Sequence, residues 1–105
     1  MILNLDYQEK QHTLQISVVL NEKSLLVTIT EPGATEIRQV ATCLPVADPE
    51  PQLLLNNEQC FASRQLAELL TRKLGRQSVV YWGLREGAEP SVRELGERIC
   101  AAASE

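Results

Sequence analysis

The spacing of apolar residues changes partway along the chain, and this change constrains the fold more than any other feature. Between residues 14 and 30, apolar side chains recur at every second position, which is typical of a β-strand with one buried face. From residue 62 onward they mostly recur at every third or fourth position, which is typical of an amphipathic helix. Strands gathered ahead of helices favour an α+β domain.

The first half predicts antiparallel strands. Two alternating runs, 14–20 and 25–30, are joined by the polar residues 21–23, which suit a hairpin. A Pro-Gly turn within 31–34 then leads to residues 36–44, which we interpret as a third antiparallel strand. Because the apolar residues of 36–44 also fit helical spacing, a short helix is the alternative there.

Shorter elements flank these strands. Residues 4–7 predict an edge strand, and the polar stretch 8–13 predicts a solvated turn. Three prolines within 45–51 predict a surface loop, and the apolar run 52–55 predicts a brief strand. Asn56 and Asn57 then predict a turn that can cap the following helix.

The second half predicts a helix, a strand and a second helix. Gly75 is a suitable C-cap for the first helix, and residues 78–84 form an apolar run that predicts a central strand. Ser91 and Glu94 match a capping box at the start of the second helix. The apolar faces are formed by Ala62, Leu66, Leu69, Leu70 and Leu74 in the first helix and by Val92, Leu95, Ile99 and Ala102 in the second.

Together these elements predict one α+β domain over residues 1–105, with an antiparallel sheet of about five to six strands and two helices on one face. The other face is not wholly polar, because Val19 and Leu26 fall on it. An apolar second face favours coverage by a partner, and hence a dimer. The alternative is that the N-terminal segment and the proline loop fold over it.

Three further features suggest protein binding. Tyr81 and Trp82 are candidate interface residues, because aromatic side chains are enriched at interface hot spots, although a sole tryptophan on a central strand equally suits the core. Arg72, Lys73 and Arg76 form a basic cluster in a chain of net charge −4. This cluster could dock an acidic protein surface, or it could be an ordinary solvated helix end.

Signals for catalysis are weak. His12 is the single histidine and has no nucleophile motif beside it, and the glycines are too scattered for a phosphate loop. Cys43, Cys60 and Cys100 lack metal-ligand spacing and are expected to be buried, reduced thiols. We therefore expect no enzymatic activity, no metal and no cofactor.

Composition bears on partners and location. Fourteen acidic residues against ten basic ones argue against nucleic-acid binding. The sequence contains no apolar run of the ~20 residues that a membrane span needs, and its start does not resemble a signal peptide. We expect a protein of the cytoplasm, or of the nucleus as well, that does not bind membranes.

One segment resembles a known family. Residues 60–84, CFASRQLAELLTRKLGRQSVVYWGL, are similar to the small proteasome assembly chaperones, best to the fourth type and next to the third, and a looser likeness extends over 14–103. The resemblance implies a non-catalytic subunit that pairs with a related small chaperone through its sheet, or with itself in isolation. It also implies binding of α-subunits during assembly of the 20S proteasome α-ring. The alternative is a dimeric adaptor or secretion-chaperone-like module of another family.

Overall fold

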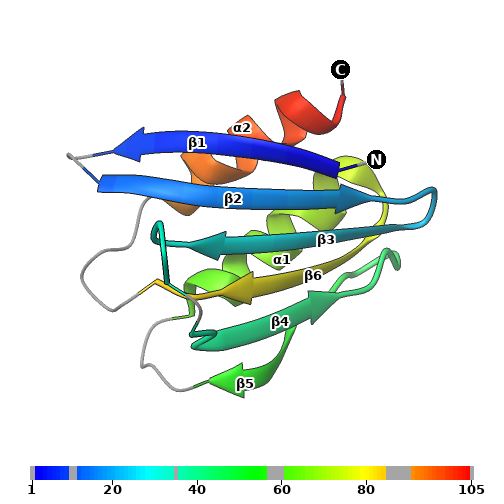
Figure 1. Cartoon of the computed structure of the whole chain (residues 1–105). Helices are drawn as coiled ribbons and strands as arrows, with labels where there is room; N and C mark the ends of the chain where they lie inside the picture. Colours follow the sequence, from blue (N-terminus) through cyan, green and yellow to red (C-terminus); the bar gives the residue numbers. More distant parts are fainter. Residues whose placement is uncertain (1, 10–11, 35, 57–60, 85–90, 105) are drawn as a thin grey trace.

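The computed structural model describes residues 2–9, 12–34, 36–56, 61–84 and 91–104 and contains one six-stranded sheet with two helices. Figure 1 looks onto the sheet, and both helices lie behind it. The α+β architecture predicted from the sequence is confirmed. The elements are β1 (Ile2–Glu9), β2 (His12–Leu20), β3 (Ser24–Thr30), β4 (Gln39–Cys43), β5 (Gln52–Asn56), α1 (Ala62–Leu74), β6 (Gln77–Trp82) and α2 (Val92–Ala103).

The sheet is mixed, so the prediction of a purely antiparallel sheet is wrong at one pair of strands. The strand order is β1-β2-β3-β6-β4-β5, and β6 runs parallel to β3 but antiparallel to β4. Because β5 is also antiparallel to β4, β5 and β6 point the same way. Parallel strands need a crossover connection, and α1 supplies it between β5 and β6.

Strand β4 confirms the strand interpretation of residues 36–44, but it does not pair with β3 as a simple hairpin would require. Strand β6 lies between β3 and β4 instead. The Gly83 N–H donates to the Ile29 carbonyl oxygen at 2.8 Å, and the Arg38 N–H donates to the Trp82 carbonyl oxygen at 2.8 Å. These bonds satisfy backbone groups on both sides of β6, as a central strand requires.

The N-terminal strands are longer than predicted. β1 pairs with β2 from Ile2↔Val19 to Glu9↔His12, so His12 opens a strand instead of lying in a solvated turn. The pairs Gln8↔Thr13 and Glu9↔His12 belong to this ladder, and ladder hydrogen bonds outweigh the weak strand propensity of these polar residues.

The core lies between the sheet and the helices. Helix α1 contacts β4, β6 and α2, and the inward side chains of the central strands are buried beneath it. The buried apolar residues with no measurable exposure are Ile16, Val18, Val27, Ile29, Ala41, Leu66, Ala67, Leu70, Val80, Trp82, Leu84, Leu95 and Ile99.

Two of the three predicted caps are observed. Gly75 ends α1 in the left-handed conformation with φ 66°, and its N–H donates to the Thr71 carbonyl oxygen. The Ser91 side chain accepts a hydrogen bond from the Glu94 N–H at 3.4 Å, at the start of α2. Asn56 ends β5 and Asn57 lies outside the described residues, while Phe61 occupies the N-cap of α1 without a side-chain bond.

Buried polar side chains fix α1 against the sheet. The Ser63 hydroxyl donates to Gln39 Oε1 at 2.6 Å near the start of the helix. Near its end, the Thr71 hydroxyl donates to the Cys43 carbonyl oxygen at 3.2 Å and lies 2.7 Å from Ser78 Oγ. Because buried polar groups are costly unless they are paired, these bonds favour one orientation of the helix.

Candidate protein interface

The face of the sheet away from the helices, which we call the open face, carries apolar side chains from β2 across to β5, with polar residues such as Thr28 and Thr42 among them. Cross-strand neighbours share a face, so the strand register defines it. One row joins Val19, Leu26 and Val79 across β2, β3 and β6. The next row joins Tyr81 on β6 to Val40 on β4, and Val40 to Leu55 on β5.

The side chains of the open face are accessible. Leu26 is 36% exposed and Leu55 is 41% exposed, whereas Leu25 and Val27, the neighbours of Leu26 on the opposite face, are 1% and 0% exposed. No described helix packs over this face, and Figure 1 looks directly onto it. The structure therefore places two of the predicted interface residues, Leu26 and Tyr81, on one surface.

Trp82 requires a correction. The sequence made it an interface candidate, but its side chain has 0% exposure and belongs to the core cluster beneath the helices. Adjacent residues of a strand point to opposite faces, so Tyr81 and Trp82 cannot both lie on the open face. The indole N–H of Trp82 is buried and has no hydrogen-bond partner among the residues that the structure describes.

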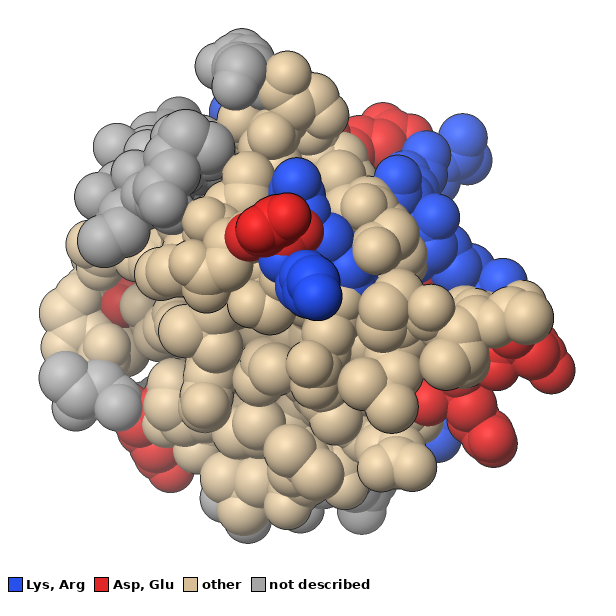
Figure 2. All heavy atoms as spheres, turned by 90° about the vertical axis from the view of Figure 1, so that its right-hand side faces the viewer, with Lys and Arg blue, Asp and Glu red and all other residues tan. Residues whose placement is uncertain are grey.

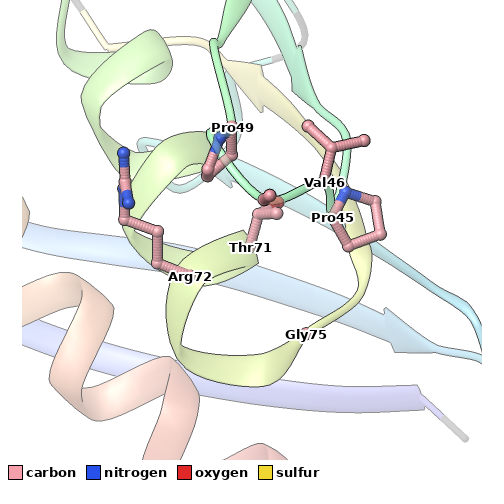
Figure 3. Close-up of a pocket in the computed structure, with 7 residues that line it drawn as sticks. Pro45, Val46, Pro49, Thr71, Arg72 and Gly75 are labelled. Atoms are coloured by element: carbon pink, nitrogen blue, oxygen red, sulfur yellow. The ribbon is translucent and has the colours of Figure 1, made fainter.

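The N-terminal segment and the proline loop were the alternative to a partner, and neither lies over the open face. The N-terminal segment forms β1 and extends the sheet at its edge. The loop 44–51 packs instead against the end of α1, where it encloses a hollow of about 310 Å³. Figure 3 shows that Pro45, Val46 and Pro49 of the loop line this hollow together with Thr71 at the end of the helix.

The basic cluster is divided between two places. The Arg72 guanidinium pairs with Glu68, four residues earlier, at 3.3 Å on the surface of α1. The Arg76 Nε donates to the Glu22 carbonyl oxygen at 3.3 Å, at the β2–β3 hairpin. Figure 2 shows basic side chains in two groups at this end of the molecule, each with acidic side chains beside it.

The remaining candidate groups are the cysteines and the residue types that bind metal ions. Among the described residues, no three His, Cys, Asp or Glu side chains are placed to hold a metal ion. Burial raises the pKa of the Cys43 and Cys100 thiols, which makes them poor nucleophiles. Cys60 lies outside the described residues. Neither described helix has the length and apolar character of a membrane span.

Comparisons with known proteins identify one fold. No family model matches the sequence, and no curated protein matches it. Among solved structures, the chain is similar to a subunit in the crystal structure of a novel chaperone complex for yeast 20S proteasome assembly. The match has a TM-score of 0.67 at 14% sequence identity and covers 98% of this chain and 92% of that chain. The two chains therefore share a fold nearly end to end.

Proposed function

We propose that this chain is a non-catalytic chaperone subunit that promotes assembly of the 20S proteasome α-ring. The observation that carries the proposal is the match to a subunit of a proteasome assembly chaperone complex, which extends over almost the whole of both chains. Because one fold can host unrelated functions, the proposal also draws on a surface suited to a partner. The likeness of residues 60–84 to the small assembly chaperones supports the same role.

The open face supports a dimer with a related small chaperone. Its apolar row runs across β2, β3 and β6, in the middle of the sheet, so a second sheet could cover it. Two packed sheets bury such faces against each other and leave their helices outside. In isolation, a second copy of this chain would meet the same requirement and form a homodimer.

Binding and release need no chemical step. A later component of the ring that binds the occupied α-subunit surface more tightly would displace the chaperone. We therefore propose a protein without enzymatic activity or cofactor, which acts in the cytoplasm, or in the nucleus as well, and binds neither nucleic acid nor membrane. The net charge of −4 supports the exclusion of nucleic acid.

Co-purification from the source cells tests the proposal. A tagged chain expressed at its natural level should recover proteasome α-subunits and a small α+β partner, both identified by mass spectrometry. Native mass measurement should find these components in a complex smaller than the complete 20S particle. Recovery of neither an α-subunit nor a small partner would contradict the proposal, and recovery of trafficking or secretion components would favour the adaptor alternative.

A further inference from the structure

A groove lies between α1 and the first turn of α2, and the two helices are on the other side of the sheet from the open face. The helices approach closely where Leu69 of α1 packs over Gly96 of α2. A Cβ at position 96 would collide with the Leu69 methyl groups, so the lack of a side chain at Gly96 permits this approach. Beside this contact the groove encloses about 530 Å³, between α1 and the first turn of α2. This volume is enough for a few side chains of a bound segment.

The groove has an apolar floor and a basic rim. Leu69 and Val92 are half-buried, pack against the core on one side and line the groove on the other. Arg72, Lys73 and Arg93 line it as well, and Glu68 is the single acidic residue among the described residues of its lining. The groove is therefore locally positive in a chain whose net charge is −4.

The basic groups of the rim are available to a ligand. Arg72 pairs with Glu68 at 3.3 Å and Arg93 pairs with Glu97 at 3.3 Å, and both pairs join exposed side chains four residues apart. Surface pairs of this kind contribute little to stability, so a carboxylate from a partner can replace either one at low cost. Burial raises the pKa of the Cys100 thiol of α2, and the nearby Lys73 ammonium partly opposes that rise.

We propose that this groove binds an acidic segment of a partner protein. An apolar side chain of the segment packs between Leu69 and Val92, and its carboxylates pair with Arg72, Lys73 and Arg93. Arg76 takes no part, because it does not line the groove and its guanidinium binds the Glu22 carbonyl at the β2–β3 hairpin. The proposal stands apart from the chaperone function, since the groove and the open face lie on opposite sides of the sheet and each can be tested alone.

The shape and charge of the groove favour a protein segment over other anions. Glu68 and Glu97 stand among the basic side chains and would repel a continuous run of phosphates. The apolar floor is set between two helices, which suits a single side chain better than the broad surface of a bilayer.

A peptide titration tests the proposal directly. The probe is a fluorescein-labelled peptide with a central leucine pair flanked by aspartate and glutamate, and binding is measured by fluorescence anisotropy at low and moderate salt. Two matched peptides serve as controls, one with amides in place of the carboxylates and one with serines in place of the leucines. We expect only the acidic, leucine-containing peptide to bind, and we expect its affinity to fall as salt rises.

Variants locate the binding surface. Reversing three charges with Arg72→Glu, Lys73→Glu and Arg93→Glu should raise the Kd about tenfold or more. Lys23→Glu and Arg76→Glu change charge outside the groove and should alter the Kd by less than about threefold, because salt screens distant charges. Val92→Glu places a carboxylate in the groove while favouring the first turn of α2, so it should abolish binding and retain the fold.

Amide NMR spectra complete the test, with thermal unfolding to establish that each variant is folded. Shifts confined to residues 65–73 and 92–100 are expected on addition of the peptide. Four results would overturn the proposal: no binding to the original chain, equal binding to the triple variant, shifts centred on the open face, or equally strong displacement of the peptide by duplex DNA or anionic lipid vesicles.

Discussion

Gly83 lies where three segments of the backbone meet. Its N–H donates to the Ile29 carbonyl oxygen at 2.8 Å, and a Cβ at this position would lie 2.6 Å from the Glu36 carbonyl oxygen. A backbone oxygen cannot move aside as the end of a flexible side chain can. The absence of a side chain therefore lets β6 end between β3 and the segment that leads into β4.

Gly83→Ala should destabilise the protein by about 1–3 kcal/mol, because the added methyl group forces the neighbouring backbone to shift. Gly96→Ala is the matched comparison, since the atoms nearest its methyl group belong to the flexible end of the Leu69 side chain and alanine favours a helix. Equilibrium urea unfolding should find a smaller effect for Gly96→Ala. Equal losses in the two variants would contradict the role assigned to Gly83.

The buried thiol of Cys43 should make the stability of the fold depend on pH. Burial raises the pKa of its thiol above the ordinary value of 9.0, with the Thr71 hydrogen bond opposing the rise. The folded state therefore favours the protonated thiol. Its contribution to stability is fully present below pH 9.0 and is lost as the pH rises through the folded pKa.

Alkylation measures the state of the Cys43 thiol. Iodoacetamide at pH 8 should modify Cys43 far more slowly in the folded protein than in urea, as followed by peptide mass spectrometry, because only the exposed thiolate reacts. Similar rates in the two conditions would show that the thiol is accessible in the folded protein.

The types of single residues do not reveal which side of β6 faces the helices. Residues 78–84 are apolar at both alternating sets, so the pattern predicts a central strand but not which set faces the helices. Ser78 and Gln39 are buried polar residues because α1 and its partners surround them, and neither is recognisable as buried from its own type. Trp82 was misplaced for the same reason, since the helices that cover it come from elsewhere in the chain.

At the scale of elements, helix α1 followed most directly from the sequence. Its apolar spacing and the glycine after Leu74 predict bounds close to those observed, because spacing and caps act within a few residues. The position of β6 could not be predicted in the same way. The hydrogen-bond partners of a strand can come from distant parts of the chain, so local spacing does not identify them. The Pro-Gly turn before β4 wrongly indicated that β4 pairs directly with β3.

The packing of α1 makes a quantitative prediction. Leu66→Ala or Leu70→Ala should destabilise the protein by about 2–5 kcal/mol, because both side chains are 0% exposed and their loss leaves a cavity. Leu54→Ala is the control, since Leu54 is 64% exposed on the edge strand and should cost less than about 0.5 kcal/mol. Urea unfolding of the three variants checks this order, and a loss for Leu54→Ala equal to the others would contradict it.

The whole molecule presents two different surfaces on its two sides. The sheet side offers a face with apolar side chains from several strands, while the helix side offers a groove with a charged rim. The sequence indicated the first of these from uneven polarity alone. It could not indicate the groove, because Leu69, Val92 and Arg93 come together only when α2 packs on α1.

Leu26→Glu should separate the proposed dimer into monomers without unfolding the chain, because it places a charge in the middle of the open face. Val46→Glu makes the same kind of change in the loop 44–51, where the side chain is 58% exposed and lies off that face, and should leave the dimer intact. Sedimentation velocity measures the masses of the two variants. A dimer that survives Leu26→Glu would contradict the assigned surface.

The central position of β6 has a consequence for synthesis on the ribosome. Strands β3 and β4 are complete by residue 43, yet the strand that joins them begins only at Gln77, after α1. A nascent chain that stops short of β6 therefore carries a three-stranded unit, β1-β2-β3, and a separate hairpin, β4-β5. Each of the two has an edge strand, β3 or β4, whose partner β6 has not yet been made. Such edges pair readily with other chains, so truncated products should aggregate, and native folding waits for the last third of the chain to emerge.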